Sequence, residues 1–381
     1  MPVKPRKTPK KPPILSHEFV IQNHADIISC VMVLFVFGII VPITSSVCYT
    51  FVAAQYANEI APRVVAYGTG VKDLCTIFFY TLVCIILHAV LQEYVLDKIS
   101  KKLHLSKIKT SMFNESGQLL VFCLISIVWA GDLIIKDDLL LNIRTIWQDY
   151  PHLNMPFMLK FFFIIQISYW IHCFPELYLS KAKREEIPAK VKLATINLIY
   201  VSALYFLNFN RVGILLMFLH YLSDGFYHFA ILFDIVDKEE KNSKISSLVS
   251  DIVFALSRIS TIVLSLVTFV FGLSSTEKPA EEVQDGDYNT LPIRLSAFGL
   301  ISALQVYRFL FFFRNHVSQL KEIKLPIGSL LKQQQQQTSS ETELEDEPKY
   351  TKRQNRKKES HLPEVDQNLK RTTRSKKLKA K

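Results

Sequence analysis

Charged residues are scarce through most of this 381-residue chain. Residues 25–314 hold only 24 basic and 24 acidic side chains, so the formal charge of +11 comes from the two ends. Residues 1–24 contribute +4 and residues 315–381 contribute +7. A soluble protein of this length would carry polar faces along all its elements. The long apolar runs between the basic ends exclude soluble, secreted and fibrous proteins, and they indicate a membrane protein.

The sequence also lacks the cysteine patterns of disulfide frameworks and zinc sites. None of the six cysteines lies in a CxxC motif, and all six fall inside or beside apolar runs. We interpret them as small buried apolar groups, and we expect no metal site. No cleavable signal peptide is apparent, because the first apolar run is too long for one. We expect that run to be an uncleaved signal anchor.

Apolar stretches of transmembrane length define the fold class. Eight of them approach or exceed the roughly 20 residues that an α-helix needs to cross a bilayer. The predicted spans are 25–52, 74–96, 117–135, 157–179, 191–207, 212–236, 249–273 and 293–313. The sequence therefore predicts an all-α polytopic membrane protein with about eight transmembrane helices. Asp137–Tyr150 clusters apolar side chains among charges, which predicts a further helix on the membrane surface.

A strong charge asymmetry predicts the orientation. An even number of spans places both termini on one side, and the segments on that side carry 35 Lys and Arg residues. That is at least five times as many as the opposite loops carry. Because Lys and Arg are retained on the cytosolic face, we expect both termini in the cytosol. The single N-x-S/T sequon, at Asn114, should then carry no oligosaccharide.

The C-terminal tail, residues 315–381, has a different composition from the rest of the chain. It combines five consecutive glutamines with an acidic patch and several basic clusters. Such a segment cannot form an apolar core, so we expect a disordered basic tail.

Ionisable side chains lie inside the predicted spans, although each is costly in lipid and usually marks function. His220, Asp224 and His228 follow one another at intervals of four residues, so their side chains project from one helical face. We interpret a larger set as a candidate polar intramembrane groove: His88, His172, Glu176, Asn208, Arg211, His220, Asp224 and His228. Three interpretations remain open: a metal or catalytic centre, a hydrated cavity for a polar substrate, or hydrogen bonds that hold the helices together.

Three further basic side chains occur within the spans. Lys160 and Arg308 lie near span ends, and we expect both to extend toward the membrane interface. Arg258 lies too deep for that arrangement. We expect Asp251 or Asp224 to be its counter-ion.

Several long segments are similar to a known family. YFLNFNRVGILLMFLHYLSD (205–224) resembles the signature of the TLC-domain superfamily, shared by ceramide synthases and the translocating chain-associated membrane (TRAM) proteins. Four further segments resemble TRAM proteins: PPILSHEFVIQNHADIISC (12–30), FFYTLVCIILHAVLQEYVLDKI (78–99), FNESGQL (113–119) and ISYWIHCFPELYLSKAKREEIP (167–188). The resemblance extends from about residue 12 to about residue 315, and it implies a TLC-type helical bundle.

The span pattern and this resemblance together predict four regions. Residues 1–24 form a cytosolic basic segment, and residues 25–116 form the first two transmembrane helices with a basic cytosolic loop. Residues 117–314 form a TLC domain of six transmembrane helices, followed by the cytosolic tail, 315–381.

The ceramide synthase pattern is incomplete in this sequence. Its His-His pair falls on Leu193 and Ala194, and its HDxxD motif becomes His220-Tyr221-Leu222-Ser223-Asp224. Acyl transfer needs a base near the nucleophile and a stabilised oxyanion. We therefore expect a protein that is not an enzyme and that needs no cofactor.

The resemblance implies a function in the endoplasmic reticulum membrane. TRAM proteins act beside the Sec61 translocon and contact signal sequences and nascent transmembrane segments, so the same partners are implied here. The basic cytosolic segments suggest the ribosome or anionic phospholipids as further partners, and a bound lipid could occupy the groove. Lys377 and Lys379 resemble a KxKxx retrieval signal for the endoplasmic reticulum.

Two other classes of function remain as alternatives. The first is a TLC-type lipid protein, either a sphingolipid N-acyltransferase or a lipid-binding sensor. The second, a transporter, is disfavoured because the sequence shows no inverted repeat and no paired helices broken by Gly or Pro.

Overall fold

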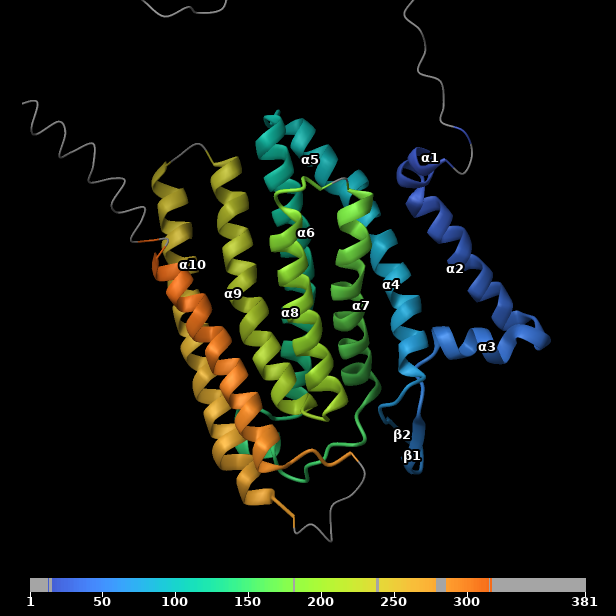
Figure 1. The fold of residues 1–381 in the computed structure, drawn as a ribbon, viewed down its shortest axis with the longest axis vertical. Helices are drawn as coiled ribbons and strands as arrows, with labels where there is room; N and C mark the ends of the chain where they lie inside the picture. Colours follow the sequence, from blue (N-terminus) through green and yellow to red (C-terminus); the bar gives the residue numbers. More distant parts are fainter. Residues whose placement is uncertain are drawn as a thin grey trace, which may run out of the picture. The chain divides into compact units, whose positions relative to one another are not determined.

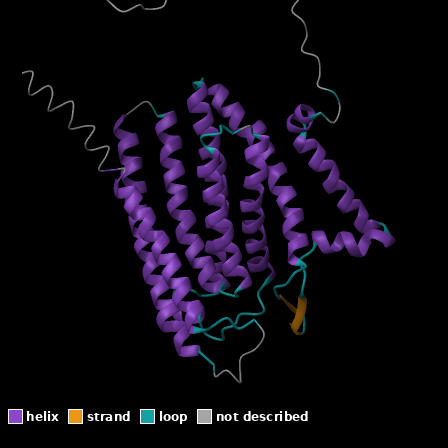
Figure 2. Ribbon diagram, viewed as in Figure 1, coloured by secondary structure: helices purple, strands orange, loops and turns teal. Residues whose placement is uncertain are grey.

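The computed structural model describes residues 13, 16–180, 182–237, 240–278, 286–314 and 316. The chain divides into two units, Met1–Arg314 and Asn315–Lys381, and nearly all described residues belong to the first. The predicted disorder of the tail and the candidate retrieval signal at Lys377 and Lys379 lie outside the described residues. Within its described part, the first unit is a bundle of helices with one two-stranded hairpin (Figure 1, Figure 2).

The long helices confirm the predicted all-α polytopic membrane fold. Among the described residues, seven helices are long and apolar enough to cross a membrane, and α2 is a shorter apolar helix. The α-helices are α1 (His17–Gln22), α2 (His24–Ile40), α3 (Pro42–Val52), α4 (Asp73–Val90), α5 (Asp97–Lys102), α6 (Lys107–Lys136), α7 (Phe157–Leu179), α8 (Ile187–Phe206), α9 (Asn210–Val236) and α10 (Glu240–Ser265). A last helix, Leu291–Arg314, completes the bundle.

Two of the spans contain a stretch of π-helix. The segment η1 (Leu91–Leu96) joins α4 to α5, and η3 (Leu266–Gly272) continues α10 into the short 3₁₀ turn η4 (Leu273–Thr276). Insertions of this kind are frequent at functional sites, because they locally re-aim the side chains of a helix.

The first predicted span, 25–52, is wrong as a single helix. Pro42 begins a new helix, and Val41 before it takes an extended conformation, with φ −83° and ψ 119°. A proline disfavours helical dihedral angles in the residue that precedes it, so the run breaks there. The helix α2 alone is about 25 Å long, and α3 turns away from it toward the lower end of α4 (Figure 1).

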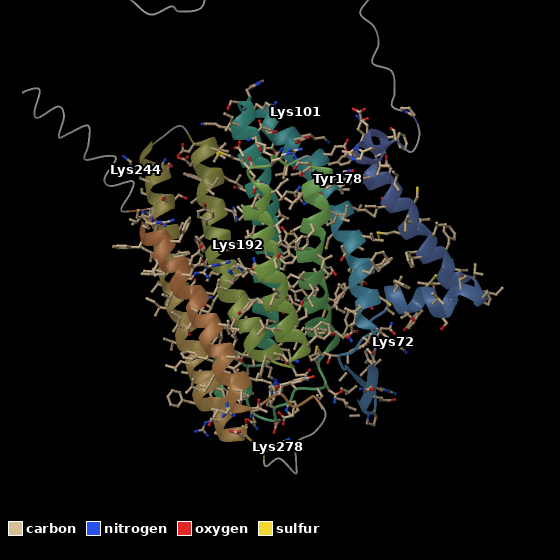
Figure 3. All side chains as sticks on the ribbon, in the orientation of Figure 1. Lys72, Lys101, Tyr178, Lys192, Lys244 and Lys278 are labelled. Atoms are coloured by element: carbon tan, nitrogen blue, oxygen red, sulfur yellow. The ribbon has the colours of Figure 1, made fainter. Side chains whose placement is uncertain are left out.

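The remaining helices alternate in direction. The start of α1 and the end of the last helix therefore lie on the same side of the bundle (Figure 1). That end carries α1, α5 and the close of the last helix, and it includes Lys101 and Lys244 (Figure 3). Lys72 and Lys278 lie at the opposite end (Figure 3). This arrangement agrees with the predicted even number of crossings. We call the two ends the basic end and the hairpin end.

The hairpin end contains structure that the sequence did not predict. Strands β1 (Ala57–Ala61) and β2 (Val64–Tyr67) pair antiparallel. Tyr67 then exchanges backbone hydrogen bonds of 2.8 and 3.0 Å with Met155, just before α7. The predicted surface helix at Asp137–Tyr150 is wrong: this loop consists of turns and one 3₁₀ turn, η2 (Ile143–Ile146).

Aromatic side chains fill the centre of the bundle. The core includes Phe162 and Phe163 of α7, Tyr205 of α8 and Met217 of α9, all fully buried. The outer faces carry exposed apolar side chains such as Leu34, Val128 and Leu300. Such a bundle, apolar both inside and outside, has the surface that lipid chains require.

Candidate functional site

The contacts of seven of the eight predicted groove residues divide these seven among three places. His88, His172 and Glu176 contact one another between α4 and α7. His220 and Asp224 contact arginines of α10 and the last helix. Asn208 and Arg211 bind loops at the hairpin end, as described below. The hydrogen bonds and ion pairs of the described residues therefore do not join the eight residues into one groove.

The first group is a chain of three side chains, which we call the histidine cluster. His172 is 1% exposed, and its Nδ1 donates to the carbonyl oxygen of Tyr169, because that carbonyl can only accept. The Nε2 of His172 is then an acceptor, and it lies 3.4 Å from Nδ1 of His88. On the far side, Nε2 of His88 lies 3.5 Å from Oε1 of Glu176. With its ring hydrogen on Nδ1, a neutral His88 presents Nε2 to the Glu176 carboxyl group as an acceptor.

Polar contacts also surround the backbone beside His88. The side-chain amide of Gln118, on α6, donates to the carbonyl oxygen of His88 at 2.9 Å. The π-helical segment η1 begins three residues later at Leu91. The carbonyl thus accepts from Gln118 in addition to the backbone N–H of Leu91, where the regular hydrogen-bond ladder of α4 changes.

The second group, which we call the arginine cluster, contains His220, Ser223, Asp224, Arg258, Gln305 and Arg308. Arg258 is 1% exposed, and its guanidinium donates to Ser223 at 3.0 Å and to Gln305 at 2.8 Å. The same guanidinium lies 3.4 Å from Asp224. Of the two counter-ions predicted for Arg258, Asp251 and Asp224, this contact confirms Asp224.

Arg308 adds a second guanidinium to the arginine cluster. It lies 3.2 Å from Nδ1 of His220, which must accept because a guanidinium can only donate. The other ring nitrogen of His220 then carries the hydrogen and faces Asp224 at 3.5 Å. The prediction that Arg308 extends to the interface is therefore wrong. The arginine cluster thus holds two guanidinium groups, of which Arg258 lies beside Asp224 and Arg308 beside His220, and the Asp224 side chain remains 33% exposed.

His228 lies on the same face of α9 as His220 and Asp224, as its spacing predicts, but its contacts differ from theirs. It lies one turn beyond Asp224 on α9. Its Nδ1 atom is buried and has no hydrogen-bond partner within the described part of the chain.

A wall of aromatic rings separates the histidine cluster from the arginine cluster. Tyr169 packs against His172, and Tyr221 packs against His220. Phe122 stacks on Tyr169 and meets Tyr221 edge-on, with ring centroids 5.3 Å apart. The two clusters are therefore neighbours on opposite sides of this wall.

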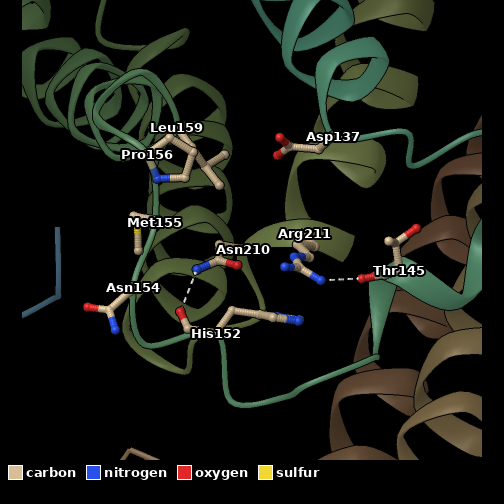
Figure 4. A pocket seen from close by; sticks show the side chains of 9 residues that line it. All are labelled: Asp137, Thr145, His152, Asn154, Met155, Pro156, Leu159, Asn210 and Arg211. Atoms are coloured by element: carbon tan, nitrogen blue, oxygen red, sulfur yellow. Dashed lines mark hydrogen bonds between the residues drawn. The ribbon is translucent and has the colours of Figure 1, made fainter. Parts of the chain in front are cut away.

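Asn208 and Arg211 fasten loops at the hairpin end. Asn208 takes a left-handed conformation (φ 57°) in the turn between α8 and α9, which Asn tolerates well. Its amide donates to the carbonyl oxygen of Gly286 at 2.9 Å. Arg211 donates to the carbonyl oxygen of Thr145 at 2.6 Å (Figure 4) and to that of Gln148 at 3.3 Å.

Lys160 and Asp73 form a buried ion pair that the sequence did not predict. Lys160 does not extend to the interface as predicted, because its ammonium lies 2.7 Å from Asp73 in the interior. Asp73 stands at the first position of α4, where an acidic residue is ordinary and gives no signal of burial. Only the approach of α4 to α7 brings the two charges together.

Comparison with known proteins connects this architecture to a family. A family model described as the TLC domain matches residues 112–314. Translocating chain-associated membrane protein 2 of Homo sapiens is 39% identical over 320 residues, which cover 83% of this chain and 86% of that protein. The Mus musculus protein of the same name is 38% identical over 320 residues, with the same coverage.

A more distant match is to an enzyme, a sphingosine N-acyltransferase. Sphingosine N-acyltransferase LAG1 of Saccharomyces cerevisiae (strain YJM789) is 24% identical over 186 residues, covering 48% of this chain and 44% of that protein. The long match to the translocating chain-associated proteins covers most of both chains and is far more similar. This protein therefore belongs to the TRAM family of polytopic membrane proteins, and it contains a TLC domain.

Proposed function

We propose that this protein is a non-enzymatic accessory of the Sec61 translocon in the endoplasmic reticulum membrane, with both termini in the cytosol. In that role it contacts signal sequences and nascent transmembrane segments and aids their translocation or insertion. The proposal is supported by the long similarity to relatives that are named for association with translocating chains. The basic end of the bundle would face the cytosol, as the distribution of Lys and Arg predicts.

The arginine cluster is the observation that carries the mechanism. Asp224 and Arg258 lie near the middle of two membrane-length helices, where an unsolvated charge is costly. The arginine cluster contains two guanidinium groups and one partly exposed carboxylate, that of Asp224, so it still has capacity to bind water or a polar group.

A passing signal sequence needs such an environment. It carries charged and polar flanks around a short apolar core, and these lose their hydrogen bonds to water when they enter lipid directly. A partly polar surface within the membrane would lower that cost without forming or breaking any bond. The histidine cluster offers a second such surface between α4 and α7.

Site-specific photocrosslinking of an arrested nascent chain tests this function. We expect Arg258→Gln and Asp224→Asn to reduce crosslinking to the signal sequence about threefold, the ratio that corresponds to ~0.6 kcal/mol for a polar contact in the membrane. Asp132→Asn is the matched control, because Asp132 pairs with Lys136 on the exposed face of α6. Unchanged crosslinking in both cluster variants would reject this mechanism.

The basic end supports a second set of contacts. Lys98, Lys101, Lys102 and Lys107 lie in or beside α5, where they could attract anionic phospholipids or ribosomal phosphates. Co-sedimentation with ribosomes at increasing salt would separate this attraction from a role in topology alone.

The alternative function is a TLC-type lipid protein, which the distant acyltransferase match favours. Against it, the positions of the family's histidine pair hold Leu193 and Ala194 on α8, and Ala194 is buried. His220 already accepts a hydrogen bond from Arg308 on the ring nitrogen that a general base would use. Acyl-CoA-dependent N-acylation by the purified protein, abolished by substitution of His220, would favour the alternative.

A further inference from the structure

A polar cavity lies at the hairpin end of the bundle, where the loop between α6 and α7 passes the first turn of α9 (Figure 4). Its volume is about 160 Å³. An apolar cavity of roughly this volume holds a benzene molecule, so this one can take up an ammonium, a short linker and part of an anionic group. Asp137 ends α6, His152 lies in the loop, and Asn210 and Arg211 begin α9. The cavity thus combines side chains from three segments.

Two buried polar atoms in the lining have no hydrogen-bond partner among the described residues: Nδ1 of His152 and Oδ1 of Asn210. Both side chains are nearly inaccessible, at 7% and 1% exposure. Nε2 of His152 lies 2.9 Å from the carbonyl oxygen of Gln148, so it carries the ring hydrogen and leaves Nδ1 as an acceptor. Buried acceptors without partners are costly, so this site calls for hydrogen-bond donors.

Asp137 and Arg211 place opposite charges on the same cavity (Figure 4). Arg211 uses one guanidinium nitrogen for the carbonyl oxygens of Thr145 and Gln148, so the rest of the group stays available to a ligand. Burial and the charge of Arg211 lower the pKa of His152 to about 4, so its ring is neutral at pH 7. Burial raises the pKa of Asp137, which Arg211 opposes.

We propose that this cavity binds a small zwitterion: a primary ammonium joined by a short linker to a phosphate or a carboxylate. The three N–H donors of the ammonium match three acceptors, namely His152 Nδ1, Asn210 Oδ1 and the Asp137 carboxylate. The anionic group pairs with Arg211. A lone cation would be repelled by Arg211 and a lone anion by Asp137, so a ligand with both charges fits best.

The surroundings favour a phospholipid head group as the source of this zwitterion. Exposed apolar side chains flank the lining residues in the chain: Leu140, Leu141, Ile143, Phe157 and Met158. Side chains of this kind beside a polar cavity allow acyl chains to remain in the bilayer while the head group enters. An ethanolamine head group has the required primary ammonium, whereas a choline head group has no N–H donor. This inference does not depend on the proposed function, since the cavity and the arginine cluster use different residues.

Thermal unfolding of the purified full-length protein tests the site. We expect free phosphoethanolamine to raise the unfolding temperature in a concentration-dependent way, and phosphocholine to have no effect, because a ligand that binds only the folded state stabilises it. The lipid source is tested by reconstituting the protein into phosphatidylcholine nanodiscs with and without phosphatidylethanolamine. Stabilisation by the ethanolamine lipid alone, without an effect of the free head group, supports the lipid form of the proposal.

Charge-neutralising variants locate the effect. Asp137→Asn should leave the fold intact and weaken phosphoethanolamine binding about tenfold, since an ionic hydrogen bond is lost. Asp138→Asn, at the adjacent exposed position, is the matched control. Arg211→Gln should also lose binding, whereas Arg144→Gln on the exposed loop should not. Equal stabilisation by phosphoethanolamine and phosphocholine would overturn the proposal, because the site would then not recognise a primary ammonium. No effect of either ethanolamine form would also overturn it and leave a cavity that holds only water.

Discussion

Lys160 of α7 and Asp73 of α4 form an ion pair with a distance of 2.7 Å between Nζ and Oδ1, and both side chains are fully buried. The ammonium also donates to the carbonyl oxygens of Gln55 and Gly68 at 2.8 and 2.7 Å. Oδ2 of Asp73 accepts hydrogen bonds from the hydroxyl of Tyr205 and from a backbone amide. This pair therefore ties α4, α7, α8 and the segment around the hairpin together at one point.

Removal of one member of this pair should be strongly destabilising. Lys160→Met leaves the Asp73 carboxylate buried without its counter-ion, and we expect a loss of about 3–5 kcal/mol in the free energy of unfolding. Lys160→Met combined with Asp73→Asn should lose less than the sum of the two single changes, because the double variant contains no uncompensated charge. Unfolding in detergent, followed by tryptophan fluorescence, measures all four proteins. Strictly additive losses would contradict direct coupling between the two residues.

The sequence predicts the helices of this protein well, because membrane spans are specified by their own composition. Seven of the eight predicted spans form helices of membrane-crossing length in the described residues, and the eighth run, 25–52, contains the shorter apolar helix α2. The exception, the run at 25–52, contains Pro42. The ring of this proline breaks the helix, although the whole run is apolar. The composition of a run thus predicts that it is helical, whereas single residues decide whether it forms one helix or two.

The candidate site was predictable only in part. The four-residue spacing of His220 and Asp224 predicts their contact, and Arg258 needs a counter-ion that a nearby helix supplies. The separation of His172 from His220 depends on aromatic packing between helices, which no single-helix pattern contains. The contact of Asp73 with Lys160 likewise joins residues far apart in the chain.

The contact between His88 and Glu176 leads to a prediction for Glu176. Because the pair lies inside a membrane span, we expect the neutral form, in which the carboxyl group donates to Nε2 of His88. Glu176→Gln keeps a donor at this position, so the free energy of unfolding should change by less than ~0.5 kcal/mol. Glu176→Leu removes the donor and should cost about 1–3 kcal/mol. Equal losses in the two variants, measured by denaturant unfolding, would contradict the neutral pair.

Stability should fall in mild acid because of His152. The pKa of this imidazole is about 4 in the folded protein, below its ordinary value of 6.5, through burial and the charge of Arg211. Between pH 6.5 and 4 the unfolded chain binds more protons, so the free energy of unfolding should drop by up to about 3 kcal/mol as the pH falls. Asp137, whose pKa is raised by burial, changes stability in the opposite direction and offsets part of this loss.

The variant His152→Gln isolates this effect. A glutamine amide can still donate to the carbonyl oxygen of Gln148, but it does not titrate. We therefore expect unfolding temperatures measured from pH 4.5 to pH 7.5 to vary much less in the variant than in the parent protein. An unchanged pH dependence in the variant would contradict the assignment of this loss to His152.

The orientation of the bundle can be tested with engineered glycosylation. The natural sequon at Asn114 lies at the basic end, where α6 begins, so we expect no glycan on the parent protein in microsomes. The change Ile60→Thr creates a second sequon at Asn58, in the hairpin at the opposite end, where both side chains are exposed. This variant should gain one glycan that endoglycosidase removes, visible as a mobility shift. The double change Asn58→Gln with Ile60→Thr is the control and should show no shift. A glycan on Asn114 instead would place the basic end in the lumen and reverse the orientation, because the two sequons lie at opposite ends of one alternating bundle.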